Sequence, residues 1–196
     1  MKLILASNSW IRTRLFDTLG IEYTKDPPEI DEKTIKEKYH DVRERVVKLS
    51  EQKAYAVLPK YRERNFLIVG SDSQNLRNGV VYGKPKTKKE AFAMIKAASN
   101  ARDIQISGWC VINAKSGQMW SGYEELHFDY LPISDKAILD YLNSPNNHSL
   151  LCSGGFEIWS RFYFRHCSRV EGSHGNFHAI PMEKIIPLLQ ENGFEI

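Results

Sequence analysis

Segments with the hydrophobic period of a strand alternate along this chain with segments that have the period of a helix, which is typical of an α/β protein. Apolar runs bounded by turn residues predict strands at residues 2–6, 21–24, 66–70, 76–78, 80–82, 104–113, 119–131 and 162–170. Capping residues and spacings of three and four predict helices at residues 10–19, 35–49, 88–98, 135–142 and 182–191. No repeat, linker or low-complexity tract interrupts this pattern. We therefore expect a single domain over residues 1–196.

The helix predicted at residues 35–49 carries the clearest amphipathic stripe in the sequence. Its apolar residues step by four, three, four and three positions: Ile35, Tyr39, Val42, Val46 and Leu49. The next step of four reaches Lys53, a residue type that is unexpected on a core-facing stripe. Either the stripe ends there and Lys53 is solvated, or its long stem carries the ammonium group inward to a site. Apolar residues continue after position 53, which favours the inward orientation.

The composition is that of a folded chain with a full core, since 42% of the 196 residues are hydrophobic and 11% are aromatic. No apolar run approaches the ~20 residues that span a bilayer, and the run at residues 3–6 is too short for a signal peptide. We therefore expect a cytoplasmic protein with no membrane partner. The net charge is +3 and the pI is near 8.7, with acids and bases interspersed. This balance is less basic than that of nucleic-acid-binding proteins, so we expect no nucleic-acid partner.

The three cysteines, Cys110, Cys152 and Cys167, are far apart, and no Cys-x-x-Cys spacing occurs. This spacing predicts neither a zinc site nor a disulfide framework, and buried thiols in a reducing compartment are the better expectation. His174 and His178 are four residues apart, but the glycine between them argues against a helical metal pair.

Asp72 is the first candidate for chemistry because it lies two residues past the apolar run at 66–70. In open α/β sheets, ligands bind outside the carboxyl ends of the strands. Small neighbours, Ser71 and Ser73, leave room for a ligand. An Asx turn that ends the strand would explain Asp72 equally well.

Asp31 and Glu32 form a second acidic site just ahead of the amphipathic helix. Carboxylates at this position are favoured by the helix dipole even without a function. Combined with Asp72, however, they would supply the hard oxygen ligands that Mg²⁺ takes in proteins.

Ser7, Asn8 and Ser9 lie between the first predicted strand and the first predicted helix. Backbone N–H groups at such a helix start bind anions, and Arg12 would be placed to contact a phosphate. A plain Ser9 cap with a solvated Arg12 is the alternative. Lys84, between a glycine and a proline, is either a positioned cation or an ordinary turn lysine.

Taken together, these motifs resemble the Maf family, also called septum formation proteins. The resemblance covers the chain nearly from end to end, and each motif is weak alone but the order and spacing of all of them are specific. The matching segments are Leu3-Ile4-Leu5-Ala6-Ser7-Asn8-Ser9 with Arg12, Pro28-Glu29-Ile30-Asp31-Glu32, Glu51-Gln52-Lys53-Ala54, Gly70-Ser71-Asp72, Gly83-Lys84-Pro85, Gly154-Gly155-Phe156, Glu171-Gly172-Ser173 with Asn176, and Ile180-Pro181.

The resemblance implies a mixed twisted sheet with flanking helices, a central cleft and a fold like that of inosine triphosphatase. It also implies hydrolysis of a nucleoside triphosphate to the monophosphate and pyrophosphate, with non-standard or modified nucleotides as substrates and a divalent cation such as Mg²⁺ as cofactor. Asp72 would be the general base or a metal ligand, and Asp31 and Glu32 would help to hold the metal. A homodimer is one assembly that the sequence allows.

The same resemblance assigns the basic and hydroxyl residues to the substrate. Lys53, Lys84 and Arg12 would neutralise the triphosphate, and Ser7 and Ser9 would lie beside it. Phosphoryl transfer needs such charge neutralisation and a positioned water, which agrees with these residue types.

The chain departs from the family at the positions that distinguish its substrate branches. Trp10 stands where the family has proline, Ile11 replaces the first specificity residue, and Ser73 stands where threonine or glutamine is usual. Trp159 replaces a glutamine or glutamate and would either stack on a base or pack in the core. The acidic segment at residues 28–32, together with the segments at residues 70–72 and 152–156, is similar to the branch that acts on 7-methyl-GTP.

Two other functions compete with this hypothesis. A nucleotide-binding protein that has lost catalysis would explain the altered signature, although pure binding would not need every retained carboxylate. A basic nucleic-acid-binding protein on a related fold is disfavoured by the even distribution of charge.

Overall fold

The computed structural model describes residues 1–195, which form an α/β protein with a mixed sheet. The strands are β1 (Lys2–Ala6), β2 (Thr24–Lys25), β3 (Phe66–Arg77), β4 (Val80–Tyr82), β5 (Arg102–Asn113), β6 (Met119–Tyr130) and β7 (Cys167–Gly172). The α-helices are α1 (Trp10–Thr18), α2 (Glu32–Lys38), α3 (Val42–Val57), α4 (Lys88–Ala98), α5 (Asp135–Leu142), α6 (Arg161–His166) and α7 (Met182–Glu191). Short 3₁₀ helices are η1 (Leu58–Lys60), η2 (Ser149–Leu151), η3 (Ser153–Gly155) and η4 (His174–His178).

The strand order is β2-β1-β3-β5-β6-β7, and β4 pairs with β3. β1 is parallel to β2 and β3, whereas the β3–β4 and β6–β7 pairs are antiparallel. The expected α/β class with a mixed sheet and flanking helices is therefore confirmed.

The chain divides into two compact units, each built from several segments. Unit 1 comprises residues 1–73 and 106–124 together with the described residues from 173 onward, and unit 2 comprises residues 74–105 and 125–172. Strands β3, β5 and β6 each begin in one unit and end in the other. The single domain expected over residues 1–196 stays a prediction.

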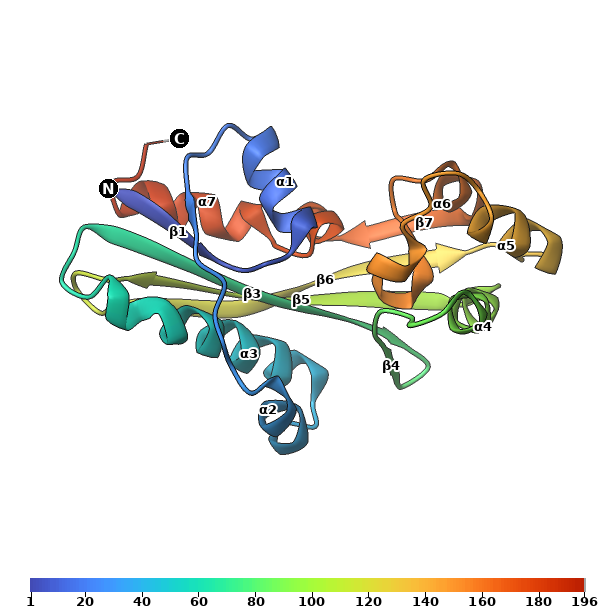
Figure 1. Ribbon diagram of the computed structural model, residues 1–196, viewed down its shortest axis with the longest axis horizontal. Coiled ribbons are helices and arrows are strands. Elements are labelled where there is room, and N and C mark those ends of the chain that lie inside the picture. Colours follow the sequence, from blue (N-terminus) through green and yellow to red (C-terminus); the bar gives the residue numbers. More distant parts are fainter. Residues whose placement is uncertain (196) are drawn as a thin grey trace. The chain divides into compact units, whose positions relative to one another are not determined.

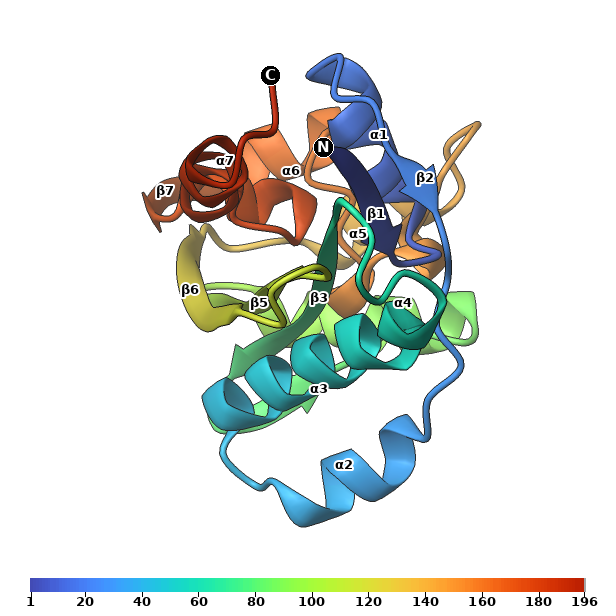
Figure 2. The ribbon, with the colours of Figure 1, turned by 90° about the vertical axis from the view of Figure 1, so that its left-hand side faces the viewer.

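Unit 1 has a hydrophobic layer on each face of its part of the sheet, because alternate strand residues point to opposite faces. Leu3 and Leu5 of β1 pack with residues of α1 and α7, whereas Ile4 and Ala6 pack with residues of α3. Figures 1 and 2 both show α3 on one side of β1 and β3, with α1 and α7 on the other. This explains why the short strands read as continuous apolar runs.

Unit 2 has a buried ion pair and a cluster of aromatic rings at its centre. Arg77 and Asp103 are both nearly inaccessible to solvent and are joined by two hydrogen bonds. The Tyr130 ring stacks on Phe156 at 4.5 Å between centroids and meets Tyr163 edge-on at 6.3 Å. Aromatic rings and aliphatic side chains together form the apolar interior of this unit.

The strand predicted at residues 162–170 is wrong over its first half, where α6 forms instead. Phe162 and Tyr163 are adjacent and both buried, while Phe164 is 67% exposed, which is a helical and not an alternating pattern. The Ser160 hydroxyl accepts a hydrogen bond from the Tyr163 N–H and caps the helix. Strand β7 then begins at Cys167.

The helix predicted at residues 35–49 is two helices, because Asp41 begins a new one. Its carboxylate accepts hydrogen bonds from the N–H groups of Arg43 and Glu44 and caps α3. Val46 and Leu49 of the predicted stripe are fully buried in α3, but α2 buries none of its residues. The stripe therefore identified the buried face of the second helix only.

The first predicted helix and the strand after it also differ in detail from the structure. In α1 the buried residues are Arg12, Leu15 and Phe16, whereas Leu19 is 43% exposed. The strand expected at residues 21–24 is the two-residue β2 at Thr24–Lys25.

All three cysteines are free thiols in the structure, as expected. Cys110 is fully buried and Cys152 and Cys167 are partly buried, and burial raises the pKa of the Cys110 thiol to about 12. Across residues 1–195, the helices are all too short or too polar to cross a bilayer.

Helix α3 lies so close to the sheet that two glycines are needed beneath it. A Cβ atom on Gly70 of β3 would lie 2.4 Å from the Ser50 carbonyl oxygen, and one on Gly108 of β5 would lie 2.2 Å from the Val46 carbonyl oxygen. Real Cβ atoms do not approach backbone oxygen this closely, so α3 has to move away if either glycine gains a side chain.

We predict that Gly108→Ala lowers the free energy of unfolding by about 1–3 kcal/mol or more, since the added methyl overpacks the α3 interface. Gly83→Ala is the matched control, because a Cβ at Gly83 meets no atom within 4 Å. Urea unfolding of both variants measures the difference. Equal stabilities of the two variants would contradict this account of the packing.

Candidate active site

Asp72 lies in the middle of β3 and not after its end. The strand predicted at residues 66–70 continues because residues 75–77 pair with β4 across the Asn78-Gly79 turn. The Asp72 backbone N–H donates to the Ser50 hydroxyl at 2.9 Å, and that hydroxyl donates to the Val46 carbonyl at 2.6 Å. Ser50 is fully buried, so this contact fixes α3 against β3 at the level of Asp72.

Lys53 is three residues beyond Ser50 on α3, and its side chain points inward, as the helical stripe predicted. Its Nζ lies 2.6 Å from Asp72 Oδ1 and 3.0 Å from Glu32 Oε1. The side chains of Lys53 and Asp72 are each only 12% exposed, and that of Glu32 is 39% exposed. We refer to Glu32, Lys53 and Asp72 as the acid–lysine cluster.

The neighbouring acids Asp31 and Glu32 have different environments. Asp31 caps α2, since its carboxylate accepts hydrogen bonds from the Lys33 N–H at 3.0 Å and the Thr34 hydroxyl at 2.6 Å. Hydrogen bonds from Thr34 and Lys33 lower the pKa of Asp31. The structure therefore brings Glu32, and not Asp31, to Lys53.

Glu32 is held in its charged form by two lysines. Burial alone would raise the pKa of Glu32, but the charge of Lys53 and hydrogen bonds from Lys36 and Lys53 outweigh it and lower the pKa to about 2. Lys36 Nζ donates to Glu32 Oε2 at 2.6 Å.

Arg12 is buried in unit 1 with 6% of its surface exposed. Its Nη1 donates to the Ser7 hydroxyl at 3.3 Å, and its Nη2 donates to the Ser73 hydroxyl at 3.4 Å. Burial lowers the pKa of Arg12, and the negative charges of Asp72 and Glu32 oppose that shift. The solvated Arg12 of the alternative interpretation is therefore wrong, and Arg12 belongs to the surroundings of the acid–lysine cluster.

Two of the other N-terminal candidates lie beside Arg12. The Ser9 N–H donates to the Ser7 hydroxyl at 3.1 Å, and Ser9 occupies the N-cap of α1 without a capping hydrogen bond from its side chain. Ile11, a predicted specificity residue, is partly buried in the first turn of α1.

No motif in the sequence points to Ala179, which orients Arg12 through its backbone. The Ala179 carbonyl accepts from Arg12 Nε at 3.0 Å and from the Ser71 hydroxyl at 3.0 Å. Its φ of 59° is in the left-handed region, which is unfavourable for residues other than glycine. Ser50 also has no sequence signal, because a serine outside the apolar stripe of a helix is typical of an exposed position.

Lys84 and Trp159 belong to unit 2. The Gly154 N–H donates to the Gly83 carbonyl at 3.0 Å, so two of the sequence motifs meet next to Lys84. Lys84 is exposed, and Trp159 is 42% exposed just before α6. That Lys84 acts together with the acid–lysine cluster stays a prediction.

We predict that the contribution of Glu32 to stability depends on pH in the acid range. A carboxylate with a lowered pKa stabilises the fold above its ordinary value of about 4.5, and the stabilisation is lost as the pH falls towards 2. The difference in unfolding free energy between the wild type and Glu32→Gln should therefore be constant above pH 5 and shrink between pH 4.5 and pH 2. Urea titrations in a chelating buffer measure it, with Glu22→Gln, an exposed glutamate, as control; a difference independent of pH would contradict the ion pairs.

We further predict that Ser50→Ala lowers the free energy of unfolding by about 1–3 kcal/mol, because the Asp72 N–H then loses the Ser50 hydroxyl as a buried acceptor. Ser116→Ala is the control, since Ser116 accepts a similar backbone bond from Gln118 in an exposed turn. Thermal unfolding of both variants separates the two cases, and an effect of Ser50→Ala no larger than that of the control would show that the buried bond contributes little.

Comparison with known proteins places the chain in a family. The family model described as "Maf-like protein" matches residues 2–192. A dTTP/UTP pyrophosphatase of Caldicellulosiruptor bescii is 30% identical over 197 residues, covering 100% of this chain and 96% of the relative. One from Thermotoga maritima is 30% identical, covering 99% of this chain and 91% of the relative.

Among solved structures, a nucleoside-triphosphatase (dITP/XTP pyrophosphatase) from Mycobacterium abscessus is 11% identical and covers 66% of this chain and 73% of its own, with a TM-score of 0.35. The family model, by contrast, spans almost the whole sequence, and the curated relatives match it over nearly their full lengths. This chain belongs to the Maf family.

Proposed function

We propose that this protein hydrolyses a nucleoside triphosphate to the nucleoside monophosphate and pyrophosphate. The observation that carries the proposal is the acid–lysine cluster beside a buried arginine, in a chain of the Maf family. Two carboxylates and two cations held within one unit are the groups that phosphoryl transfer requires for positioning and charge neutralisation. The names of the relatives, dTTP/UTP pyrophosphatases, support the same reaction class.

In this proposal, cations bind the triphosphate. Lys53 and Arg12 of unit 1 supply positive charge, together with the hydroxyls of Ser7 and Ser9. The Gly83-Lys84-Pro85 motif is the reason for proposing Lys84 as a further cation for the triphosphate. The planar guanidinium of Arg12 already donates in three directions and is therefore fixed before substrate binds. A fixed cation stabilises developing charge without reorganisation at the moment of reaction.

The residues present fit a divalent cation such as Mg²⁺. Asp72 and Glu32 both contact the Lys53 ammonium group, so two hard oxygen donors already face a common positive charge. Mg²⁺ is commonly held by one or two protein carboxylates together with substrate phosphates. We assign Asp72 and Glu32 as the protein ligands, with Asp31 supporting them through the α2 cap. When bound, the metal would neutralise charge on the phosphates.

Asp72 is the proposed general base. It accepts a proton from a water whose oxygen forms the new bond to the α-phosphorus, while the bond from that phosphorus to the bridging oxygen breaks and pyrophosphate leaves. Lys53, 2.6 Å away, orients the Asp72 carboxylate, and Ser50 fixes its backbone. Both contacts hold the base in one position before substrate arrives.

The names of the relatives and the sequence motifs favour different nucleobases in the substrate. The relatives are named for dTTP and UTP, which supports a pyrimidine substrate. The sequence motifs favour 7-methyl-GTP, a modified nucleotide. Ile11, Ser73 and Trp159 occupy the positions proposed to select the base, and the Ser73 hydroxyl contacts the Arg12 guanidinium.

The products and the site of attack test the reaction. With Mg²⁺ and ¹⁸O-labelled water, we expect pyrophosphate as product and the label in the nucleoside monophosphate. A panel of UTP, dTTP, 7-methyl-GTP and the common nucleotides ranks the substrates. Orthophosphate as product, or label in the pyrophosphate, would overturn attack at the α-phosphorus. Tight binding without turnover would select the nucleotide-binding function instead.

Asp72→Asn tests the catalytic assignment. We predict that it lowers kcat about 10²–10⁴-fold, the usual contribution of a positioned general base. Asp26→Asn is the matched control, since Asp26 is also paired with a lysine, Lys60 at 2.8 Å, but lies outside the cluster. Steady-state kinetics on the preferred nucleotide measures both variants, and equal turnover by Asp72→Asn and the wild type would remove Asp72 from the mechanism.

Two further expectations accompany the proposal. A homodimer stays a prediction, which the molar mass in solution checks. A cytoplasmic location also stays a prediction, which cell fractionation checks.

A further inference from the structure

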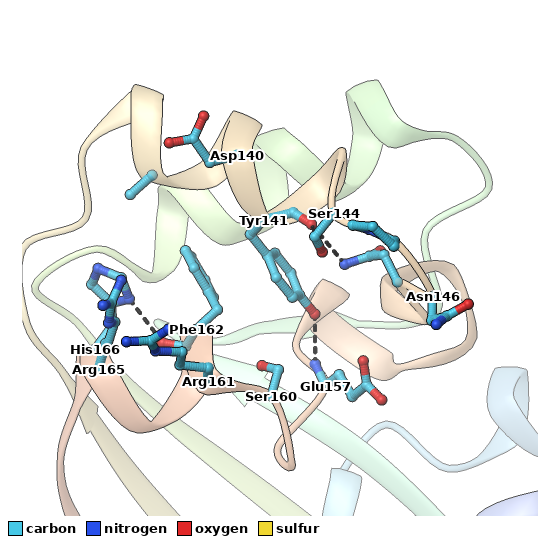
Figure 3. Close-up of a pocket in the computed structure, with 13 residues that line it drawn as sticks. Asp140, Tyr141, Ser144, Asn146, Glu157, Ser160, Arg161, Phe162, Arg165 and His166 are labelled. Atoms are coloured by element: carbon cyan, nitrogen blue, oxygen red, sulfur yellow. Dashed lines mark hydrogen bonds between the residues drawn. The ribbon is translucent and has the colours of Figure 1, made fainter.

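A cavity of about 380 Å³ lies within unit 2, between α5, the loop that follows it, and α6 (Figure 3). Its lining residues fall between positions 137 and 166, so it contains no member of the acid–lysine cluster. This volume lies in the range of cavities that hold small molecules. None of the residues proposed for the reaction lines this cavity.

The apolar wall of the cavity is a stack of aromatic rings. Tyr141 and Phe162 stack with their centroids 4.3 Å apart and their planes within 12°, and the His166 ring packs on Phe162 at 4.5 Å. The Tyr141 hydroxyl accepts from the Glu157 N–H at 3.0 Å and donates to the Gly155 carbonyl at 3.3 Å. Figure 3 shows Tyr141 projecting from α5 between Phe162 and Glu157. The wall is thus fixed by hydrogen bonds at its polar end.

The rim of the cavity carries two arginines without an acidic partner. Arg161 and Arg165 are four residues apart on α6, so they lie on one face of the helix, and both are exposed. In the described part of the chain neither side chain forms an ion pair or a hydrogen bond. Two guanidinium groups therefore face solvent beside an apolar cavity.

The acids at the rim already have cationic or imidazole partners. Asp140 accepts from Lys136 Nζ at 2.6 Å, and Glu157 Oε1 lies 3.2 Å from His148 Nδ1. Neither contact involves Arg161 or Arg165, so both guanidinium groups remain open to a ligand at the cavity mouth. An anionic ligand would be attracted there, and its apolar part would enter the cavity.

We propose that this cavity binds a phosphate monoester that carries a planar ring. The phosphate lies between Arg161 and Arg165, and the ring lies against the wall formed by Tyr141 and Phe162. Guanidinium groups match the geometry of phosphate oxygens, and a phosphate has enough oxygens to accept from both arginines. A nucleoside monophosphate belongs to this ligand class, but the inference does not depend on the reaction proposed above.

Calorimetric titration of the full chain with phenyl phosphate tests the site. We expect saturable binding by the wild type and at least tenfold weaker binding by the Arg161→Ala/Arg165→Ala double variant. The matched control is Arg62→Ala/Arg64→Ala, which removes two exposed arginines of unit 1 and should bind as the wild type does. Phenyl phosphate should also bind Lys53→Met, which alters the acid–lysine cluster and leaves the cavity intact.

Further ligands separate the two parts of the site. Uridine monophosphate should bind, whereas inorganic phosphate and uridine alone should each bind at least tenfold more weakly. Equal affinity of the wild type and the Arg161/Arg165 double variant would overturn the proposal, and so would an equal loss in the Arg62/Arg64 control. Inorganic phosphate that binds as tightly as phenyl phosphate would overturn the role of the aromatic wall.

The same double variant keeps this proposal separate from the catalytic one. Arg161→Ala/Arg165→Ala should hydrolyse the triphosphate at the basal rate of the wild type in the absence of added monoester. Loss of phenyl phosphate binding with unchanged hydrolysis supports a second site. Loss of hydrolysis in parallel with phenyl phosphate binding would overturn it, because the arginines would then belong to the reaction itself.

Discussion

The close packing of α3 on the sheet is the constraint on which the candidate active site depends. Gly70 and Gly108 let the helix backbone approach the strands, and this approach brings the Ser50 hydroxyl within hydrogen-bonding distance of the Asp72 N–H. Lys53 then lies one helical turn from Ser50 and reaches the Asp72 carboxylate. A helix displaced by the width of a methyl group would separate the Asp72 carboxylate from the Lys53 ammonium group.

Within this arrangement, opposite charges are buried together and balance one another. Glu32 and Asp72 carry two negative charges, and Lys53 and Arg12 carry two positive ones. Burial disfavours each charge taken alone, and it therefore lowers the pKa of Arg12. For Glu32 the two neighbouring lysines outweigh burial and lower the pKa to about 2. The four charges sum to zero, so each buried charge in this arrangement has a compensating partner of opposite sign.

The spacing of hydrophobic residues correctly predicted the helices and strands in which the buried residues recur at one regular interval. The strand at residues 2–6 and the helix at residues 182–191 have the predicted bounds, and the inward orientation of Lys53 followed from its place on the α3 stripe. The patterns failed where a cap or a tertiary partner decided. Asp41 divides one predicted helix into two, and the strands predicted separately at residues 66–70 and 76–78 are one continuous strand, β3. Neither effect can be read from hydrophobic spacing.

Local periodicity and the order of the motifs along the chain were enough to predict the fold class, the residue types of the candidate site and the family to which they point. The tertiary structure alone decided that Glu32 contacts Lys53 while Asp31 caps α2, and that the Ala179 carbonyl orients Arg12. Neighbouring acids look equivalent in a sequence, and a backbone carbonyl has no sequence signature. Their roles are set by the direction in which each group points once distant segments have packed.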